Sequence, residues 1–398
     1  MPNNRRRKTR KSTLIRDTIS NKNFIIISSI LLAVIIICVI VNVILSVQEQ
    51  KKIAEEQQRI ADHVEEIYSA MEADVDSINN FKASSIIRIS AIGDILLGDN
   101  LKKYGKNADG LYNDIFSNVT KYLKDSDITL GTYETNISDD TKVFANAVKE
   151  AGIDLVTLAH NHALDNGEEG LKATQDYLES VGIQTVGKYA EEAQDRIKII
   201  EEKGVRIAVL SYTYDNGKTG VNIYSEEQAS SDLAYANENA DFTIVLMHWG
   251  DVYKEEPNST QKAQAQFLVN NGADIIIGAH PSVVEPMEIL KNKEGQDCLV
   301  AYSLGDFTSD FSYENSNLEL VLNIQIYYDA ETDTVSLYKV DYTPIYMNDY
   351  GKQNTINRYK LLDLKNEIAN YGKDGSNLDK KTYDKLVRGI DRINGIIE

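Results

Sequence analysis

The chain has 398 residues, of which 42% are hydrophobic and 26% are charged, and its formal charge is −19 at pH 7. The apolar residues are enough to bury a core, and the charged residues exclude a chain that is membranous along most of its length. Residues 1–23 hold eight Lys and Arg against one Asp, a charge of +7, which leaves −26 for the remainder. So acidic a body argues against nucleic acid as a partner, because phosphate binding needs a basic patch.

Residues 24–47 form a run of 24 residues without a charge, directly after the basic residues 1–23. At a rise of about 1.5 Å per residue, a helix of this length crosses a hydrocarbon core of about 30 Å. A cleaved signal peptide is the alternative, but its apolar region is only about 7–15 residues long. Because basic residues favour the cytoplasmic side, we expect a single-pass protein of the cell membrane, anchored in the lipid bilayer. Residues 1–23 would then be cytoplasmic and the main domain extracellular.

Residues 48–84 have the pattern of a polar helix. Apolar residues recur from Ile53 to Ile78 at steps of seven, four, three, four, four and three, flanked by Glu, Lys and Gln. This spacing is close to a heptad repeat. It leaves two interpretations open: a helix that packs one face on the main domain, or a short coiled-coil stalk through which the chain forms a homodimer.

From residue 85 onward, short apolar runs alternate with amphipathic helical stretches such as 168–181 and 260–271. The apolar runs lie at residues 86–93, 127–132, 154–159, 206–211, 241–247, 274–279 and 298–303. This alternation of strands and helices predicts an α/β fold over residues 85–346. Polar, helical sequence then predicts a helical C-terminal appendage over residues 347–398.

The ends of six expected strands carry side chains that can ligate a metal. These residues are Asp94, Glu134, His160, Asn161, His162, His248, His280 and Asp306. In an open α/β sheet, ligands bind in the crevice beyond the carboxyl ends of the strands. Imidazole nitrogens together with carboxylate oxygens suit zinc, manganese or iron. Any one of these residues could be an ordinary hydrogen-bonded side chain or a turn cap, but the set indicates one shared site.

The ordered motifs resemble those of the CapA family, the poly-γ-glutamate capsule synthesis proteins. The matching stretches are GDILLG (93–98), YE (133–134), LAHNHALD (158–165), HWG (248–250), GAHP (278–281) and YSLGDF (302–307). The resemblance implies an αββα sandwich similar to metallophosphatases, with a metal site at the strand ends. It also implies a role in capsule or poly-γ-glutamate synthesis or export.

The resemblance further implies a role for each residue of the site. The implied metal ligands are Asp94, Glu134, Asn161, His248 and His280. His162 is the implied catalytic imidazole, and Asp94 and His160 are further candidates for a catalytic role. We expect one well-held divalent transition metal, which would be Mn, Zn or Fe.

Five positions depart from the patterns of the two families. Three of them, Thr132, His160 and Asp306, stand where the CapA pattern usually has Asn. Leu96 stands where the phosphoesterase pattern has a His, and Ser282 stands where the CapA pattern usually has a second His. A second metal would therefore be weakly held or missing, unless His160 or Asp306 replaces the lost ligands.

Two functions from different classes remain open. The first is a metal-dependent hydrolase of a phosphoester or an amide, with His162 as general acid or base. The second is a non-catalytic subunit that binds a cell-surface polymer such as poly-γ-glutamate, or that serves as a scaffold for polymer synthase subunits. The charge of −26 does not suit a polyanion, so bridging cations or a local basic groove would be needed.

Overall fold

The structure is a computed structural model, and it describes residues 86–214, 217, 220–311, 313, 315–373 and 378–397. The chain divides into two units, Met1–Phe81 and Lys82–Glu398, and all described residues belong to the second unit. The predicted cytoplasmic segment, membrane-spanning helix and stalk therefore lie outside the described residues. Within the described part of the chain, no helix combines the length and the hydrophobicity that a membrane crossing requires.

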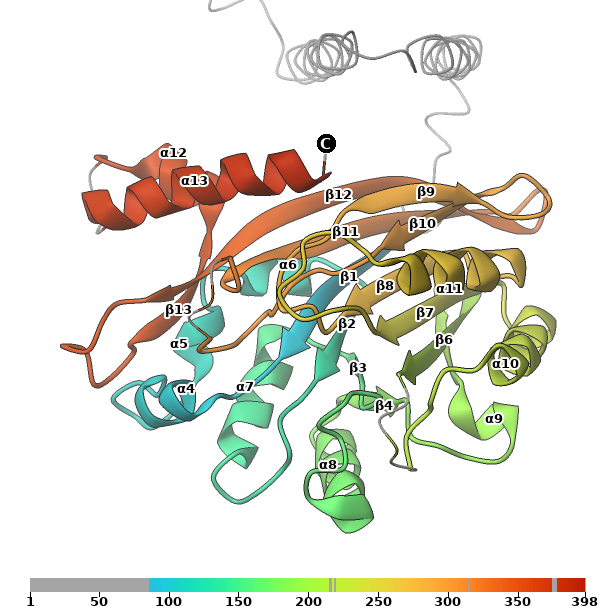
Figure 1. Ribbon diagram of the computed structural model, residues 1–398, viewed down its shortest axis with the longest axis horizontal. Coiled ribbons are helices and arrows are strands. Elements are labelled where there is room, and N and C mark those ends of the chain that lie inside the picture. Colours follow the sequence, from blue (N-terminus) through green and yellow to red (C-terminus); the bar gives the residue numbers. More distant parts are fainter. Residues whose placement is uncertain are drawn as a thin grey trace, which may run out of the picture. The chain divides into compact units, whose positions relative to one another are not determined.

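Two sheets and ten helices make up the described residues, so the predicted mixed α/β fold is confirmed (Figure 1). The first sheet has the order β13-β12-β11-β1-β2-β3-β4. Its strands are β1 (Ile86–Ile95), β2 (Ile128–Tyr133), β3 (Leu155–Thr157), β4 (Gln184–Val186), β11 (Leu318–Asp329), β12 (Thr334–Asp349) and β13 (Tyr359–Asp363).

The second sheet has the order β5-β6-β7-β8-β10-β9. Its strands are β5 (Lys198–Glu202), β6 (Val205–Thr213), β7 (Phe242–His248), β8 (Ile275–Ala279), β9 (Met287–Lys291) and β10 (Asp297–Ala301). Each sheet contains four consecutive parallel strands, β1 to β4 in the first and β6, β7, β8 and β10 in the second. All seven apolar runs singled out in the sequence are strands, because strands covered on both faces need apolar residues throughout.

The two sheets pack face to face around one large core. This core includes Ile89 and Leu322 from the first sheet and Val209 and Ile277 from the second. Separate apolar clusters bury the outer faces of the sheets under helices. On the first sheet these helices are α4 (Asp99–Tyr104), α5 (Asn113–Phe116), α6 (Thr120–Lys124), α7 (Lys142–Ala151) and α8 (Gly167–Ser180). On the second sheet they are α9 (Ala193–Arg196), α10 (Glu226–Asn239) and α11 (Ser259–Asn270). The layers therefore follow the order helices, sheet, sheet, helices.

The C-terminal residues differ from the expected helical appendage. They begin with the end of β12 and the strand β13, which extends the first sheet by pairing antiparallel with β12. Helices α12 (Leu364–Asn370) and α13 (Lys380–Ile397) follow, and they add Leu386 and Ile393 to the core between the sheets. The expected appendage is thus part of the main fold, because its apolar residues belong to the core between the sheets and do not form a core of their own.

The end of β1 is held close to the loop that follows β10. The Asp94 N–H donates to the Gly305 carbonyl at 3.2 Å, and the Thr308 N–H donates to the Asp94 carbonyl at 3.1 Å. Gly93 allows this approach, since a Cβ atom at that position would lie 1.7 Å from the Gly305 carbonyl oxygen. The contact fixes the backbone from which the Asp94 side chain projects.

We predict that Gly93→Ala destabilises the fold by about 1–3 kcal/mol, because the added methyl group forces two backbone segments apart. Urea unfolding of the full chain would measure this loss. Gly395→Ala is the control: a Cβ atom at Gly395 would meet no atom of another part of the chain within 4 Å, and alanine favours the helix by up to about 1 kcal/mol. An unchanged unfolding midpoint for Gly93→Ala would contradict the prediction.

Candidate metal centre

The five predicted metal ligands come from the carboxyl ends of strands in both sheets. Asp94 lies at the end of β1, Glu134 directly follows β2, and Asn161 lies in the loop after β3. From the second sheet, His248 ends β7 and His280 directly follows β8. Because the two sheets pack face to face, these strand ends meet at one edge of the sandwich.

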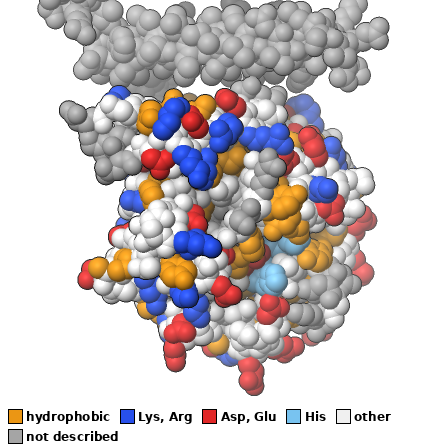
Figure 2. Space-filling view, turned by 60° about the vertical axis from the view of Figure 1, so that its left-hand side comes forward, with side chains coloured by type: hydrophobic (Ala, Val, Ile, Leu, Met, Phe, Trp, Pro, Cys, Tyr) orange, Lys and Arg blue, Asp and Glu red, His pale blue; other side chains and the backbone are white. Residues whose placement is uncertain are grey.

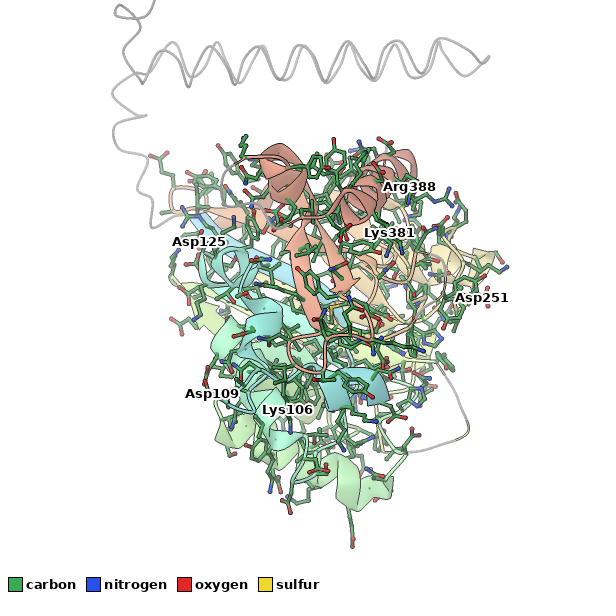
Figure 3. All side chains as sticks on the ribbon, turned by 90° about the vertical axis from the view of Figure 1, so that its left-hand side faces the viewer. Lys106, Asp109, Asp125, Asp251, Lys381 and Arg388 are labelled. Atoms are coloured by element: carbon green, nitrogen blue, oxygen red, sulfur yellow. The ribbon has the colours of Figure 1, made fainter. Side chains whose placement is uncertain are left out.

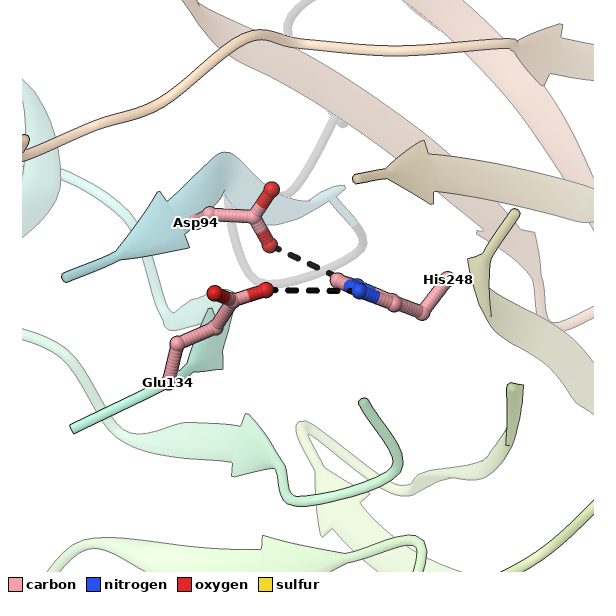
Figure 4. Close-up of side chains that lie close together, drawn as sticks. All are labelled: Asp94, Glu134 and His248. Carbon is pink, nitrogen blue, oxygen red and sulfur yellow. Dashed lines mark ion pairs between the residues drawn. The ribbon is translucent and has the colours of Figure 1, made fainter. Parts of the chain in front are cut away.

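Asp94, Glu134 and His248 form a buried group that could hold a metal ion, since one ligand atom from each lies within 4.8 Å of the others (Figure 4). The His248 Nδ1 atom is 3.6 Å from Asp94 Oδ1, and the His248 Nε2 atom is 3.3 Å from Glu134 Oε1. Asn161 joins the group, because its Oδ1 atom lies 2.9 Å from His248 Nε2. The imidazole of His248 thus links carboxylates of the first sheet to the second sheet.

His280 completes the group in an unusual backbone conformation. Its φ is +98°, which few residues with side chains adopt. Such a conformation costs on the order of 1–3 kcal/mol and is typical of functional sites. It directs the His280 N–H to Asp94 Oδ2 at 2.9 Å and places the His280 ring centroid 4.6 Å from that of His248. The structure therefore brings all five predicted ligands together, and their role as ligands stays a prediction.

Several polar atoms of this group are buried and lack a hydrogen-bond partner among the described residues. They are Asp94 Oδ1, His160 Nδ1, His248 Nδ1 and Asp306 Oδ2. Burying a polar atom without a partner is costly, and a bound cation would satisfy such atoms. Carboxylate oxygens and imidazole nitrogens are also the donors that zinc, manganese and iron accept. The residues present fit a divalent transition metal.

The carboxyl groups of the site hold their protons unusually strongly. Burial raises the pKa of Asp94 well above its usual range, and the charges of Glu134 and Asp306 raise it further. Burial, and then the charge of Asp306, raise the pKa of Glu134 to about 8. Burial also raises the pKa of Asp306 to about 7. A bound cation would favour the ionised carboxylates, so metal binding would release protons.

The histidines of the site are shifted in the opposite direction. Burial lowers the pKa of His248 well below its usual range, and neighbouring histidines lower it further. Burial also lowers the pKa of His280 to about 4 and that of His160 to about 3. These imidazoles are therefore neutral at neutral pH, which is the form that ligates a metal.

The two candidate catalytic histidines lie in different surroundings. His160 is buried, and its ring centroid is 6.0 Å from that of His248. The His162 side chain is 52% exposed, and its Nδ1 atom lies 2.8 Å from Asp165 Oδ2. A carboxylate at this distance orients the ring and favours the tautomer with the proton on Nδ1. His162 can therefore exchange protons with solvent, whereas His160 cannot do so directly.

The structure retains Asp306 at the site and adds one residue. Asp306, which the sequence placed at the shared site as a possible replacement ligand, lies near enough to Asp94 and Glu134 to shift their pKa values. Tyr214 was missed: its ring centroid is 5.1 Å from that of His280 and 6.4 Å from that of His248. Tyr214 directly follows β6, so its place at a strand end was the available signal, but it is neither a histidine nor a carboxylate.

Comparison with known proteins assigns the chain to a family. The profile described as "Bacterial capsule synthesis protein PGA_cap" matches residues 88–311, more than half of the chain. The chain belongs to this family. The matched region of this PGA_cap protein includes every site residue described above and ends before β11.

Two relatives of this PGA_cap protein carry the name CapA, which confirms the resemblance inferred from the motifs. "Capsule biosynthesis protein CapA" of Bacillus anthracis is 31% identical over 56% of this chain and 60% of its own length. "PGA biosynthesis protein CapA" of Bacillus subtilis (strain 168) is 29% identical over 57% of this chain and 64% of its own length. This chain thus spans less than two thirds of either relative.

Among solved structures, a "novel phosphatase" of Mycoplasma pneumoniae is similar over 65% of this chain and 93% of that chain. The sequence identity is 14% and the TM-score is 0.44.

We predict that Glu134→Gln stabilises the metal-free protein at pH 8, by about 1–3 kcal/mol, and does so much less at pH 5. Between pH 4.5 and 8 the folded state keeps a proton that the unfolded state has lost. The stability of the wild type therefore falls as the pH rises through this window, and glutamine removes the effect. Urea unfolding with a chelator present would measure the difference.

Glu294→Gln is the matched control, because Glu294 is exposed in a turn. It should change stability equally little at both pH values. If Glu134→Gln had the same small effect as this control at pH 8, the carboxyl group of Glu134 would not be held in its protonated form.

Proposed function

We propose that this chain is a membrane-anchored, extracellular protein of capsule or poly-γ-glutamate biosynthesis or export, with a metallophosphatase-like site that hydrolyses a phosphoester or an amide. The family description and the names of the two CapA relatives support the link to capsule synthesis. The uncharged run at 24–47 and the basic residues before it support the anchor and its direction. Polymer synthase subunits and a cell-surface polymer are the proposed partners.

The observation that carries the proposal is the buried group of Asp94, Glu134 and His248, with Asn161 and His280 in contact with it. Carboxyl groups and neutral imidazoles are gathered where no Lys or Arg, among the described residues, forms an ion pair with them. A structural role alone would favour apolar residues or a salt bridge here, because uncompensated buried acids destabilise a fold. A cation site accounts for both the residue types and their burial.

A bound divalent transition metal would polarise a substrate oxygen and neutralise the charge that develops during hydrolysis. Asp94, Glu134, Asn161, His248 and His280 would hold it. His162 would move the proton: with its Nδ1–H directed to Asp165, its Nε2 atom can accept a proton from water or donate one to a leaving group. Its exposed position allows the proton to be returned to solvent.

The alternative is a subunit that binds the polymer without cleaving it. The observation that favours it is Leu96, whose apolar side chain stands where phosphoesterases of this kind place an imidazole for a second metal. Ser282 likewise replaces a second histidine after His280. A site with one metal would retain binding while lacking the two-metal clamp of common phosphoesterases.

We predict that the full chain, purified in mild detergent and loaded with manganese, zinc or iron, holds about one metal per chain. His248→Ala and His280→Ala should each lower metal affinity by at least about tenfold, because each removes a ligand. Elemental analysis after dialysis would measure the metal content. His162→Ala is the control, since His162 is exposed and would act as a proton carrier; it should keep the metal while losing hydrolysis.

Wild-type protein that binds none of the three metals would contradict the metal site and with it the hydrolase. Metal bound equally by wild type and both ligand variants would place the site elsewhere. Metal binding without hydrolysis of phosphoesters or γ-linked glutamate amides would favour the polymer-binding alternative.

A further inference from the structure

A second feature of the molecule is an open cavity of about 550 Å³ beside the C-terminal helix α13. Its lining includes three basic residues of α13, Lys385, Arg388 and Arg392, and the aromatic residues Tyr253 and Tyr313. The two tyrosine rings stack with their centroids 4.0 Å apart. Figure 2 shows Lys and Arg side chains gathered on the upper part of the face that also exposes histidine. We refer to this cavity as the basic groove.

The position of the basic residues follows from the sequence of α13. The buried positions Leu386, Gly389 and Ile393 form the apolar stripe of this helix. The basic residues Lys385, Arg388 and Arg392 each precede a buried position by one residue, at steps of three and four, so they share one face next to that stripe. The apolar stripe packs against the sheet, so the basic residues lie along the edge of the contact between helix and sheet. Gly389 brings the helix close, because a Cβ atom there would lie 2.6 Å from a methyl group of Leu318.

The charges of the groove are only partly neutralised. Arg392 pairs with Glu255, whose Oε1 atom also accepts from Asn315 at 2.7 Å. Lys385 and Arg388 form no ion pair within 4.0 Å in the part of the chain that the structure describes. Figure 3 shows Arg388 projecting from α13. Two unpaired cations side by side are notable on a body whose sequence carries a charge of −26 beyond residue 23.

The basic groove is connected to the candidate metal centre through Tyr253. The N–H of this residue donates to the Pro281 carbonyl at 2.7 Å, and Pro281 directly follows the predicted ligand His280. Val283, on the same segment, lines the groove. Burial, and then the charge of Asp306, raise the pKa of Tyr253, so its ring lies within electrostatic reach of the metal centre. A ligand lying along the groove would thus lead toward the predicted metal.

We propose that the basic groove binds successive carboxylate groups of an acidic polymer, a segment of poly-γ-glutamate, and guides it to the metal centre. The choice of polymer rests on the function proposed above. Lys385 and Arg388 supply the cations, and the guanidinium of Arg388 can bind a carboxylate through two parallel hydrogen bonds. The paired Tyr rings supply a rigid apolar wall for the methylene groups of the chain.

A local basic groove allows a protein with a net negative charge to bind a polyanion. A polyanion is repelled by an acidic protein at long range, but at an ionic strength of 0.15 M this repulsion is screened beyond about 8 Å. Lys385 and Arg388, which form no ion pair among the described residues, then decide where the polymer can bind. Most of the groove lies beyond residue 311, where the match to the family profile ends. The family profile therefore does not account for these lining residues.

The test uses the full chain in mild detergent and a short γ-linked glutamate oligomer carrying a fluorescein label, with binding followed by fluorescence anisotropy. We expect Lys385→Glu/Arg388→Glu to weaken binding by about tenfold or more, because attraction becomes repulsion at both positions. The milder pair Lys385→Gln/Arg388→Gln should weaken it less. Wild-type binding should also weaken as salt is raised from 0.05 to about 0.5 M.

The matched control is Lys380→Glu/Lys381→Glu, which makes the same change in net charge on the same helix outside the lining of the groove. It should bind within about twofold of wild type, since screening limits the reach of its charges. Melting temperature and metal content, measured for every variant, would show that fold and metal centre are intact.

Three outcomes would overturn the proposal: no binding of the oligomer to wild type, equal weakening in the groove pair and the control pair, or tighter binding of a glycerol phosphate polymer than of the glutamate oligomer. Metal content separates this proposal from the proposed function. Metal bound without oligomer binding refutes the groove alone, and oligomer binding at the groove without any metal refutes the metal centre alone.

Discussion

The burial of three acids in one place is the constraint on which the rest of this structure depends. Asp94, Glu134 and Asp306 lie in surroundings so poor in water that each carboxyl group keeps its proton far above its usual range. Within the described residues, no Lys or Arg pairs with them, and the nearby imidazoles are themselves held neutral. Such an arrangement is unfavourable on its own and becomes favourable once a cation joins it, which is why the geometry indicates a metal centre.

The two-sheet architecture makes this gathering possible. Parallel strands point their carboxyl ends to one edge, and two packed sheets bring two such edges together. The first sheet supplies the carboxylates and the second supplies His248 and His280. The close backbone contact between Gly93 and Gly305 holds the end of β1 against the loop after β10. The strained backbone at His280 positions its imidazole ring beside His248. The stability of the large shared core outweighs the cost of these local features.

The C-terminal residues connect the fold to a wider surface. Strand β13 and helices α12 and α13 complete the core between the sheets, and α13 also borders the open groove that Tyr253 connects to the candidate metal centre. Helix α13 thus has a buried face and a groove-lining face: Leu386 and Ile393 are buried in the core, while Lys385 and Arg388 line the groove. The proposed binding of an acidic polymer to this acidic protein depends on such a local exception to the overall charge.

The sequence by itself determined the α/β class, the family and which strands end in polar residues, because apolar runs and strand-end residues are local patterns. It gave no reason to expect Tyr214 at the site, since a tyrosine after a strand is ordinary. It also suggested a separate helical appendage, because β13 has only five residues and the sequence after it is polar and helical. Only the tertiary structure decided that His248 contacts Asp94, Glu134 and Asn161. It also decided that cations of α13 line a cavity together with Tyr253 and Val283. These relations join residues far apart in sequence, and the packing of the two sheets, which no local pattern specifies, sets their distances.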